Sequence, residues 1–238
     1  MFRLFLTQTS EMASDALNSV LAGIEEVRDL QKANPTPPGG LPARPRVVRA
    51  INRASVILLS SHLERYLRNV NEEAIGVVNA ATIVGSALPE SLRLEHSKIP
   101  IDELAAAQWQ HRAPMLSQLL ATDGWLWGSS PTADLDHDRL LRWMKSPSPE
   151  RTLRLFKLWN VPDIFSVVTR QPHTRQRMWL KLKELVDKRN DIAHGDAGAE
   201  ATYQDVATYV AVVRAFCTRA DPVLARALAP YAGGTRPW

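Results

Sequence analysis

The sequence predicts an all-α protein, a bundle of about five or six helices with an irregular insertion that contains tryptophans. Three observations predict this class. Apolar residues recur at intervals of three and four in several long segments, and no segment alternates polar and apolar residues over the length of a strand. Glycine contributes only 11 of the 238 residues, which favours helix over strand. We therefore expect one helical domain over residues 1–238.

The first helix is expected within residues 1–33. Its apolar residues lie three or four positions apart, as on one face of an amphipathic helix: Leu17, Val20, Leu21, Ile24, Val27 and Leu30. Ser10 and Glu11 precede this run and suit the positive end of a helix. Residues 34–45 hold five prolines and two glycines, so they stop the helix and form a linker or a long ordered loop.

The second helix is expected over residues 46–81, which carry the longest run of periodic apolar residues. A helix of this length usually crosses the centre of a bundle. Residues 82–147 follow with little regular pattern, and we interpret them as an insertion or a connection. Within them a short helix is expected to end near Pro114, and the stretch "DHDRLLRWM" predicts another short helical piece.

Clear helical signals return in residues 148–230. Ser148 is a typical N-cap, Pro149 occupies the first helical position, and Pro162 is expected to end this helix. The segment "HTRQRMWLKLKELVDKRNDIAH" predicts the next helix over residues 173–194.

The boundaries of the last helices have their own signals. Gly195 follows the helix of residues 173–194 as a stop signal. Thr202 and Asp205 form a box-like start for the final helix, and Pro222 is a candidate break near its end. Where the loops between such helices are short, we expect neighbouring helices to be antiparallel.

Composition narrows the function classes. The net charge of +4 and the pI of about 9.4 are compatible with a polyanionic partner but do not require one. Cys217 is the only cysteine, so an internal disulfide and a cysteine-rich zinc site are excluded, and its helical spacing predicts a buried structural thiol. The sequence contains no run of about 18 apolar residues, so no membrane-spanning helix is expected. The apolar opening "MFRLFLTQTS" is too short for a secretory signal, so a cytoplasmic location is expected.

An arginine interrupts the apolar stripe of the helix predicted over residues 173–194. The stripe consists of Met178, Leu182, Leu185 and Val186. Continuing its period leads to Arg189, and Asn190 and His194 lie one turn apart at its edge. A buried, unpaired guanidinium costs several kcal/mol. One interpretation is that Arg189 pairs with a carboxylate of the long helix, for example Glu64, and that His194 is an ordinary helix-end residue. The other is that Arg189 faces a wet cleft or a partner's surface.

Two segments carry a resemblance to a known family. The residues "RNDIAH" at positions 189–194 resemble the Arg-polar-x-x-x-His motif of the HEPN superfamily of helical ribonucleases and nucleotide-binding domains. The segment "ILLSSHLERYLRNVNEEA" at positions 57–74 resembles the early helix of its RiboL-PSP branch, in which Glu64 and Tyr66 would give structural support. In some HEPN toxins a tyrosine that is modified by an antitoxin follows the histidine closely. Here the first tyrosine, Tyr203, lies well downstream, so this control is not expected.

The resemblance implies a metal-independent endoribonuclease without a cofactor. RNA supplies its own nucleophile, the 2′-hydroxyl, and cleavage would leave a 2′,3′-cyclic phosphate. Histidine titrates near neutral pH and suits proton transfer, which is the role expected of His194. The fork of donors on Arg189 suits phosphate oxygens, and Asn190 would orient the histidine or the phosphate. The family further implies a homodimer with a composite active site, and a toxin or antiviral defence effector with an antitoxin or defence-system partner. The candidates to guide the RNA backbone are Arg175, Arg177, Lys181, Lys183 and Lys188, and the alternative for each is an ordinary solvated side chain.

The alternative is a non-catalytic helical module that binds RNA, a nucleotide or a protein partner. Seven tryptophans are present, and they suit base stacking as well as packing in a core or loop. A metal site is not expected. The acidic stretch "DLDHD" at positions 134–138 lacks the length and the glycine of an EF-hand loop.

Overall fold

The structure is a computed structural model that describes residues 13–34, 44–129, 134–196 and 198–238. These residues form nine α-helices and no strand, which confirms the predicted all-α class. The helices are α1 (Asp15–Lys32), α2 (Pro45–Ala80), α3 (Glu90–Ala106), α4 (Arg112–Asp123), α5 (His137–Leu141), α6 (Pro149–Lys157), α7 (Ile164–Val168), α8 (Pro172–Ala193) and α9 (Tyr203–Leu228). The predicted number of five or six helices was wrong, chiefly because residues 82–147 contribute α3, α4 and α5.

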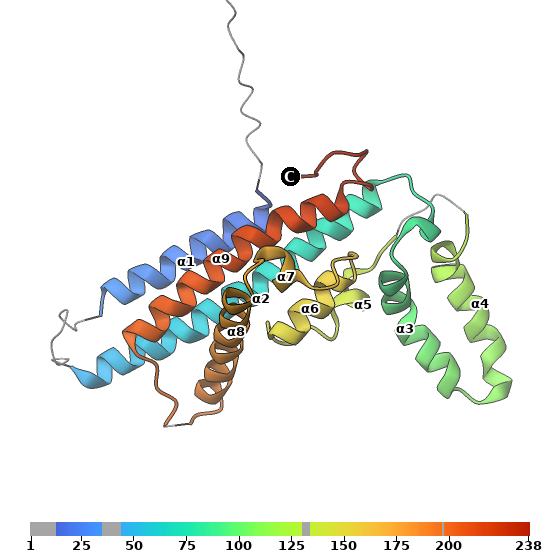
Figure 1. Ribbon diagram of the computed structural model, residues 1–238. Helices are drawn as coiled ribbons and strands as arrows, with labels where there is room; N and C mark the ends of the chain where they lie inside the picture. Colours follow the sequence, from blue (N-terminus) through green and yellow to red (C-terminus); the bar gives the residue numbers. More distant parts are fainter. Residues whose placement is uncertain (1–12, 35–43, 130–133, 197) are drawn as a thin grey trace, which may run out of the picture.

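The three longest helices lie side by side. In Figure 1, α1 and α2 form an antiparallel pair, and α9 packs along both with its C-terminal end near the end of α2. Helix α8 crosses α2 and projects from it, with the short helices α6 and α7 beside it. Helix α2 contacts α1, α5, α8 and α9, so it lies at the centre of the helices.

Polar contacts fix one end of the three-helix layer. Ser14 caps α1, since its hydroxyl accepts the Leu17 N–H at 2.9 Å, while the predicted Ser10 lies outside the described residues. The Ser14 hydroxyl also donates to the buried carboxylate of Asp221 in α9. Burial raises the pKa of Asp221 even though hydrogen bonds from Ser14 oppose the shift. The start of α1 is thereby joined to the last turns of α9.

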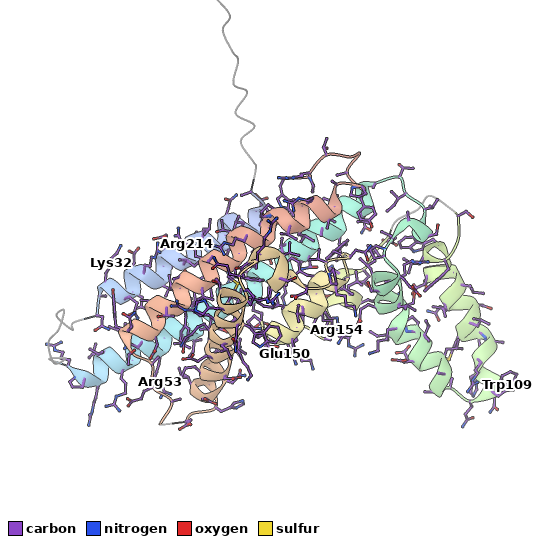
Figure 2. The ribbon with its side chains drawn as sticks, viewed as in Figure 1. Lys32, Arg53, Trp109, Glu150, Arg154 and Arg214 are labelled. Atoms are coloured by element: carbon purple, nitrogen blue, oxygen red, sulfur yellow. The ribbon has the colours of Figure 1, made fainter. Side chains whose placement is uncertain are left out.

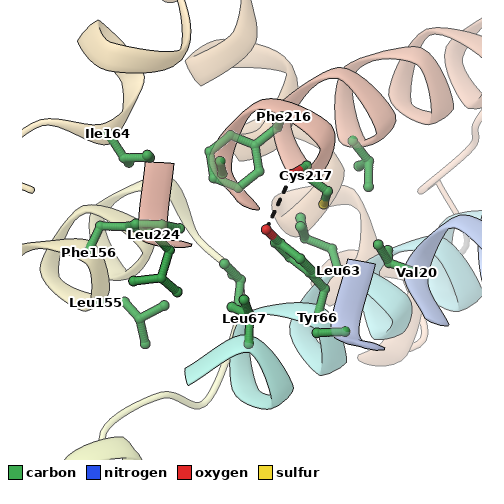
Figure 3. Packing of buried hydrophobic residues seen from close by; sticks show 14 of the residues in the cluster. Val20, Leu63, Tyr66, Leu67, Leu155, Phe156, Ile164, Phe216, Cys217 and Leu224 are labelled. Atoms are coloured by element: carbon green, nitrogen blue, oxygen red, sulfur yellow. Dashed lines mark hydrogen bonds between the residues drawn. The ribbon is translucent and has the colours of Figure 1, made fainter. Parts of the chain in front are cut away.

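The centre of the core lies between α2 and α9. Tyr66 is fully enclosed there and donates a hydrogen bond to the backbone carbonyl of Cys217 at 3.3 Å (Figure 3). Leu63, Leu67 and Phe216 pack around this pair. Cys217 is a buried free cysteine, and its burial raises the pKa of the thiol, so the predicted structural thiol is confirmed.

The C-terminal signals are mostly confirmed. Ser148 caps α6 with Pro149 at its first turn, and Thr202 and Asp205 form a reciprocal capping box at the start of α9. Helix α6 ends at Lys157, earlier than the predicted stop at Pro162, and the short helix α7 follows. Pro222 lies inside α9 without dividing it. No helix in the described part of the chain has the length and apolarity needed to cross a membrane.

The interpretation of residues 82–147 as a region with little regular pattern was wrong, although α5 lies where the stretch "DHDRLLRWM" predicted a helical piece. They include α3 and α4, which form a hairpin at one end of the molecule, with the 82% exposed Trp109 at its tip (Figures 1 and 2). Pro100 lies inside α3, and Pro114 lies in the first turn of α4 instead of ending a helix. Asp123 is the only buried residue of α4. With so little buried surface, the hairpin has no apolar stripe for the sequence to display.

A buried polar cluster ties this hairpin to α5. His96 of α3 accepts the backbone N–H of Asp136 at Nε2 (3.0 Å), and its Nδ1 lies 3.6 Å from the carboxylate of Asp123. The same carboxylate accepts from Arg139 of α5 at 2.7 Å. Arg154 of α6 adds an ion pair to Glu95 of α3 at 2.7 Å. The hairpin is therefore positioned mainly by directional polar contacts.

Candidate functional site

The C-terminal end of α8 places His194 by a defined backbone motif. The N–H of Gly195 donates to the carbonyl of Ile192 (3.1 Å), and the N–H of Asp196 donates to that of Asp191 (3.0 Å). These two bonds form a Schellman motif, which needs a left-handed residue after the cap. Gly195 has a φ of +82°, as the predicted stop signal requires. His194 is therefore the C-cap, and its backbone is held on both sides.

Arg189 and Asn190 form the other half of the site. Both side chains are half-buried, and Arg189 donates from Nη1 to Oδ1 of Asn190 at 3.1 Å. Among the described residues Arg189 has no ion pair, so the pairing with Glu64 that one interpretation of the sequence suggested is not observed. Its guanidinium bonds a neutral amide and not a carboxylate.

His194 faces solvent. Its side chain is exposed, and within the described ranges its imidazole makes no hydrogen bond or ion pair. It follows Asn190 by one helical turn, so the two side chains are neighbours on one flank of α8. One guanidinium, one amide and one imidazole thus lie together at the open end of a helix.

Two arginines of α2, which the sequence analysis missed, hold the segment that follows His194. Arg53 donates to the backbone carbonyls of Asp196 (3.2 Å) and Ala199 (3.5 Å), and Arg49 forms an ion pair with Glu200 at 2.9 Å. The signal in the sequence was the spacing of these arginines by four, which puts both on one face of α2. The contacts fasten the exit of the α8 motif to the central helix.

A second missed network joins α8 to α9. The Tyr209 hydroxyl donates to Oε1 of Glu184 at 2.7 Å, and Lys181 binds Oε2 of the same carboxylate at 2.6 Å. Burial by itself raises the pKa of Glu184, but the hydrogen bonds from Lys181 and Tyr209 lower it overall. Burial, followed by the bond to Glu184, raises the pKa of Tyr209. Lys181, predicted to guide RNA, therefore already has an ion-pair partner.

The predicted RNA-guiding residues do not form one surface with the motif. Successive residues of an α-helix are rotated by about 100°, so Arg177, Lys181 and Lys188 share one flank of α8, and Asn190 and His194 lie on the other side of the buried stripe. Lys183 lies on the flank of His194 but pairs with Asp187 at 2.6 Å. Arg175 is far along the helix, where it lines a pocket of about 500 Å³ with Trp179.

The two predicted support residues differ in their surroundings. Tyr66 lies in the core, where it binds the Cys217 carbonyl, whereas Glu64 is half-buried on α2. No group of three or more histidine, cysteine, aspartate or glutamate side chains in the described part of the chain is arranged to hold a metal ion.

Comparison with known families adds one result. The RiboL-PSP-HEPN family model matches residues 138–224, from α5 to most of α9, and this range includes residues 189–194. Residues 57–74, which the sequence analysis also compared with that family, lie outside the match. No curated protein and no solved structure matches the chain. Similarity to the RiboL-PSP-HEPN family therefore extends over residues 138–224 of the chain.

Proposed function

We propose that the protein is a metal-independent endoribonuclease in which Arg189, Asn190 and His194 form the catalytic motif. The observation that carries the proposal is the charge of Arg189: half-buried, bonded to a neutral amide, and without a carboxylate partner among the described residues. A folded protein tolerates such a cation where solvent, or an anion from outside the monomer, reaches it. A phosphodiester is such an anion. The family match over residues 138–224 supports this interpretation.

The residues suit transesterification. The 2′-oxygen of RNA would attack the adjacent phosphorus, the new 2′-O–P bond would form as the P–O5′ bond breaks, and the product would be a 2′,3′-cyclic phosphate. Arg189 would bind the phosphate oxygens as negative charge grows on them. His194 is exposed, so an RNA strand can approach it, and it would transfer one of the two protons. Asn190 would hold the guanidinium in place.

A second proton transfer needs a second group. We propose that it comes from His194 of another copy, in a homodimer that brings two α8 ends together. This arrangement would also give Arg189 an anionic ligand shared by two chains. Light scattering would report the mass, and specific activity should fall when the protein is diluted below its dimerisation constant. Constant specific activity of a monomer would contradict the composite site.

The test of the nuclease is cleavage of a structured RNA in EDTA by purified protein. His194→Ala should lower the rate by about 10²–10⁴, as expected for loss of a general acid or base. Arg189→Ala should lower it by about 10²–10³. The matched controls are His173→Ala, an exposed histidine at the other end of α8, and Arg219→Ala, an exposed arginine of α9. If His194→Ala cleaves RNA at the wild-type rate, the assignment of His194 as a catalytic residue is wrong.

The cellular setting follows from the family alone. We propose a cytoplasmic toxin or antiviral defence effector, controlled by an antitoxin or another protein of the same system. Deletion or induction of the gene in its host would test this: growth arrest that requires His194 is the expected result. Unaffected growth on induction of the active enzyme would argue against a toxin.

The α3–α4 hairpin favours a second candidate function, a non-catalytic module for a protein partner. Its surface carries exposed large apolar side chains: Leu94, Ile101, Trp109, Leu116 and Leu120. Such surface clusters are typical of protein contacts. Folded wild-type protein that neither cleaves nor binds RNA at moderate salt would favour this function. Tight, salt-sensitive RNA binding without cleavage would favour an RNA-binding module instead.

A further inference from the structure

Three arginines surround one pocket that lies apart from the α8 motif. The pocket has a volume of about 420 Å³ and is lined by Arg68 of α2 together with Asp138, Arg139, Leu141 and Arg142 of α5 and its cap. In Figure 1, α6 lies between α5 and α8. Three arginines and one aspartate line the pocket, so the lining carries a net positive charge.

Two of the arginines are held in place by the protein. Arg68 donates to the backbone carbonyl of Met144 at 2.8 Å. Arg139 donates to Asp123, which is buried, at 2.7 Å. A guanidinium has five N–H donors in a fixed plane, so each side chain retains donors after making its anchoring bond. These two groups are oriented before any ligand arrives, which lowers the entropy cost of binding.

The third arginine has no anchor. Arg142 is exposed and makes no hydrogen bond or ion pair within the described ranges. The opposing carboxylate, Asp138, is itself 86% exposed and lies 3.3 Å from the imidazole of His137. Solvent screens it, so it offsets only part of the charge of Arg68 and Arg142, whereas Arg139 is already paired with Asp123.

We propose that this arginine pocket binds a phosphoryl group. Planar guanidinium groups match the tetrahedral face of a phosphate with paired N–H donors, and they are less strongly hydrated than lysine ammonium groups. The phosphoryl group belongs either to an RNA strand or to a free nucleotide. Only the RNA source rests on the proposed nuclease function, whereas occupation by a nucleotide does not.

The test measures binding of a short single-stranded RNA and, separately, of ATP to full-length protein. All proteins carry His194→Ala, so that RNA is not consumed. Arg142→Gln should weaken binding of at least one probe by about ten-fold, because one good guanidinium–phosphate contact is lost. For RNA the slope of log affinity against log salt should also fall by about one. Loss with RNA alone identifies a strand phosphate, and loss with ATP identifies a nucleotide.

Two further variants make the result specific. Asp138→Asn removes the only carboxylate of the lining and should strengthen binding by a few fold, which no unfolded variant would do. Arg219→Gln removes an exposed arginine of α9 and should leave both affinities unchanged. If Arg142→Gln and Arg219→Gln bind both probes with equal affinity, the proposal that this pocket binds a phosphoryl group is overturned. Because the readout is binding, it stays valid if the wild-type protein proves not to cleave RNA.

Discussion

Arg189 donates a hydrogen bond to the side chain of its sequence neighbour Asn190, with Nη1 3.1 Å from Oδ1, at the C-terminal end of α8. Neighbouring residues of a helix point about 100° apart, so this bond turns the guanidinium away from the buried stripe and toward the flank that bears His194. By its spacing Arg189 belongs to the apolar stripe that faces the core. The hydrogen bond links its side chain to the polar side chains of the motif instead.

The first prediction concerns Asn190→Ala. Loss of a hydrogen bond to a charged group costs about 1.5 kcal/mol or more, so we expect kcat/KM for RNA to fall about ten-fold, less than for His194→Ala. Gln176→Ala, an exposed amide on the same helix, should leave kcat/KM unchanged. A full loss of activity with Asn190→Ala would instead indicate that the amide contacts the reacting groups directly.

The second prediction concerns Gly195. An alanine at a φ of +82° is strained, and about 1–2 kcal/mol is the cost of a left-handed residue with a Cβ. Gly195→Ala should lower the free energy of unfolding by about that amount and misplace His194, reducing cleavage more than tenfold. Gly195→Asn should recover most of both losses, since asparagine tolerates this conformation. Urea unfolding and RNA cleavage measure the two effects, and equal losses for both variants would count against the backbone motif.

The third prediction compares two helical glycines. A Cβ on Gly23 of α1 would overlap the imidazole of His62, whereas a Cβ on Gly76 of α2 would meet nothing within 4 Å. Gly23→Ala should therefore destabilise the protein by about 1–3 kcal/mol through overpacking. Gly76→Ala should stabilise it by about 0.5–1 kcal/mol, because alanine is the better helix former. Thermal or urea unfolding decides, and loss of stability in both variants would show that the α1–α2 contact is not the cause.

The fourth prediction concerns acid stability. Burial lowers the pKa of His96, although the nearby charge of Asp123 opposes the shift; Asp136 and Arg139 also face the ring. The unfolded chain then takes up its proton at higher pH than the folded one. The contribution of His96 to stability is therefore complete above about pH 6.5 and is lost as the pH falls through its folded pKa.

Urea unfolding between pH 7.5 and 5.5 measures this effect. In this range the stability of the wild type should fall more steeply than that of His96→Gln, whose side chain cannot take up a proton. His62, whose pKa burial also lowers, contributes in the same direction in both proteins and cancels in the difference. The control His173→Gln removes an exposed histidine and should follow the wild-type curve. Parallel curves for wild type and His96→Gln would contradict the prediction.

Local signals in the sequence determined much of this protein. Several signals depend only on residues a few positions apart, so a short segment is enough to predict them. They are the cap at Ser148, the Thr202–Asp205 capping box, the stop at Gly195 and the apolar period of α2. The same holds for the motif at residues 189–194, which is one and a half turns of a single helix.

Tertiary structure decided the rest. The α3–α4 hairpin buries few side chains, and most of them are polar. Its sequence therefore lacks the periodic apolar residues that predict a helix. The arginine pocket needs Arg68 and Arg142, 74 positions apart in sequence, to meet across α2 and α5. The same is true of Arg53 and the segment after His194. Contacts between distant residues depend on how helices pack, and helical spacing within one segment carries no information about its neighbours.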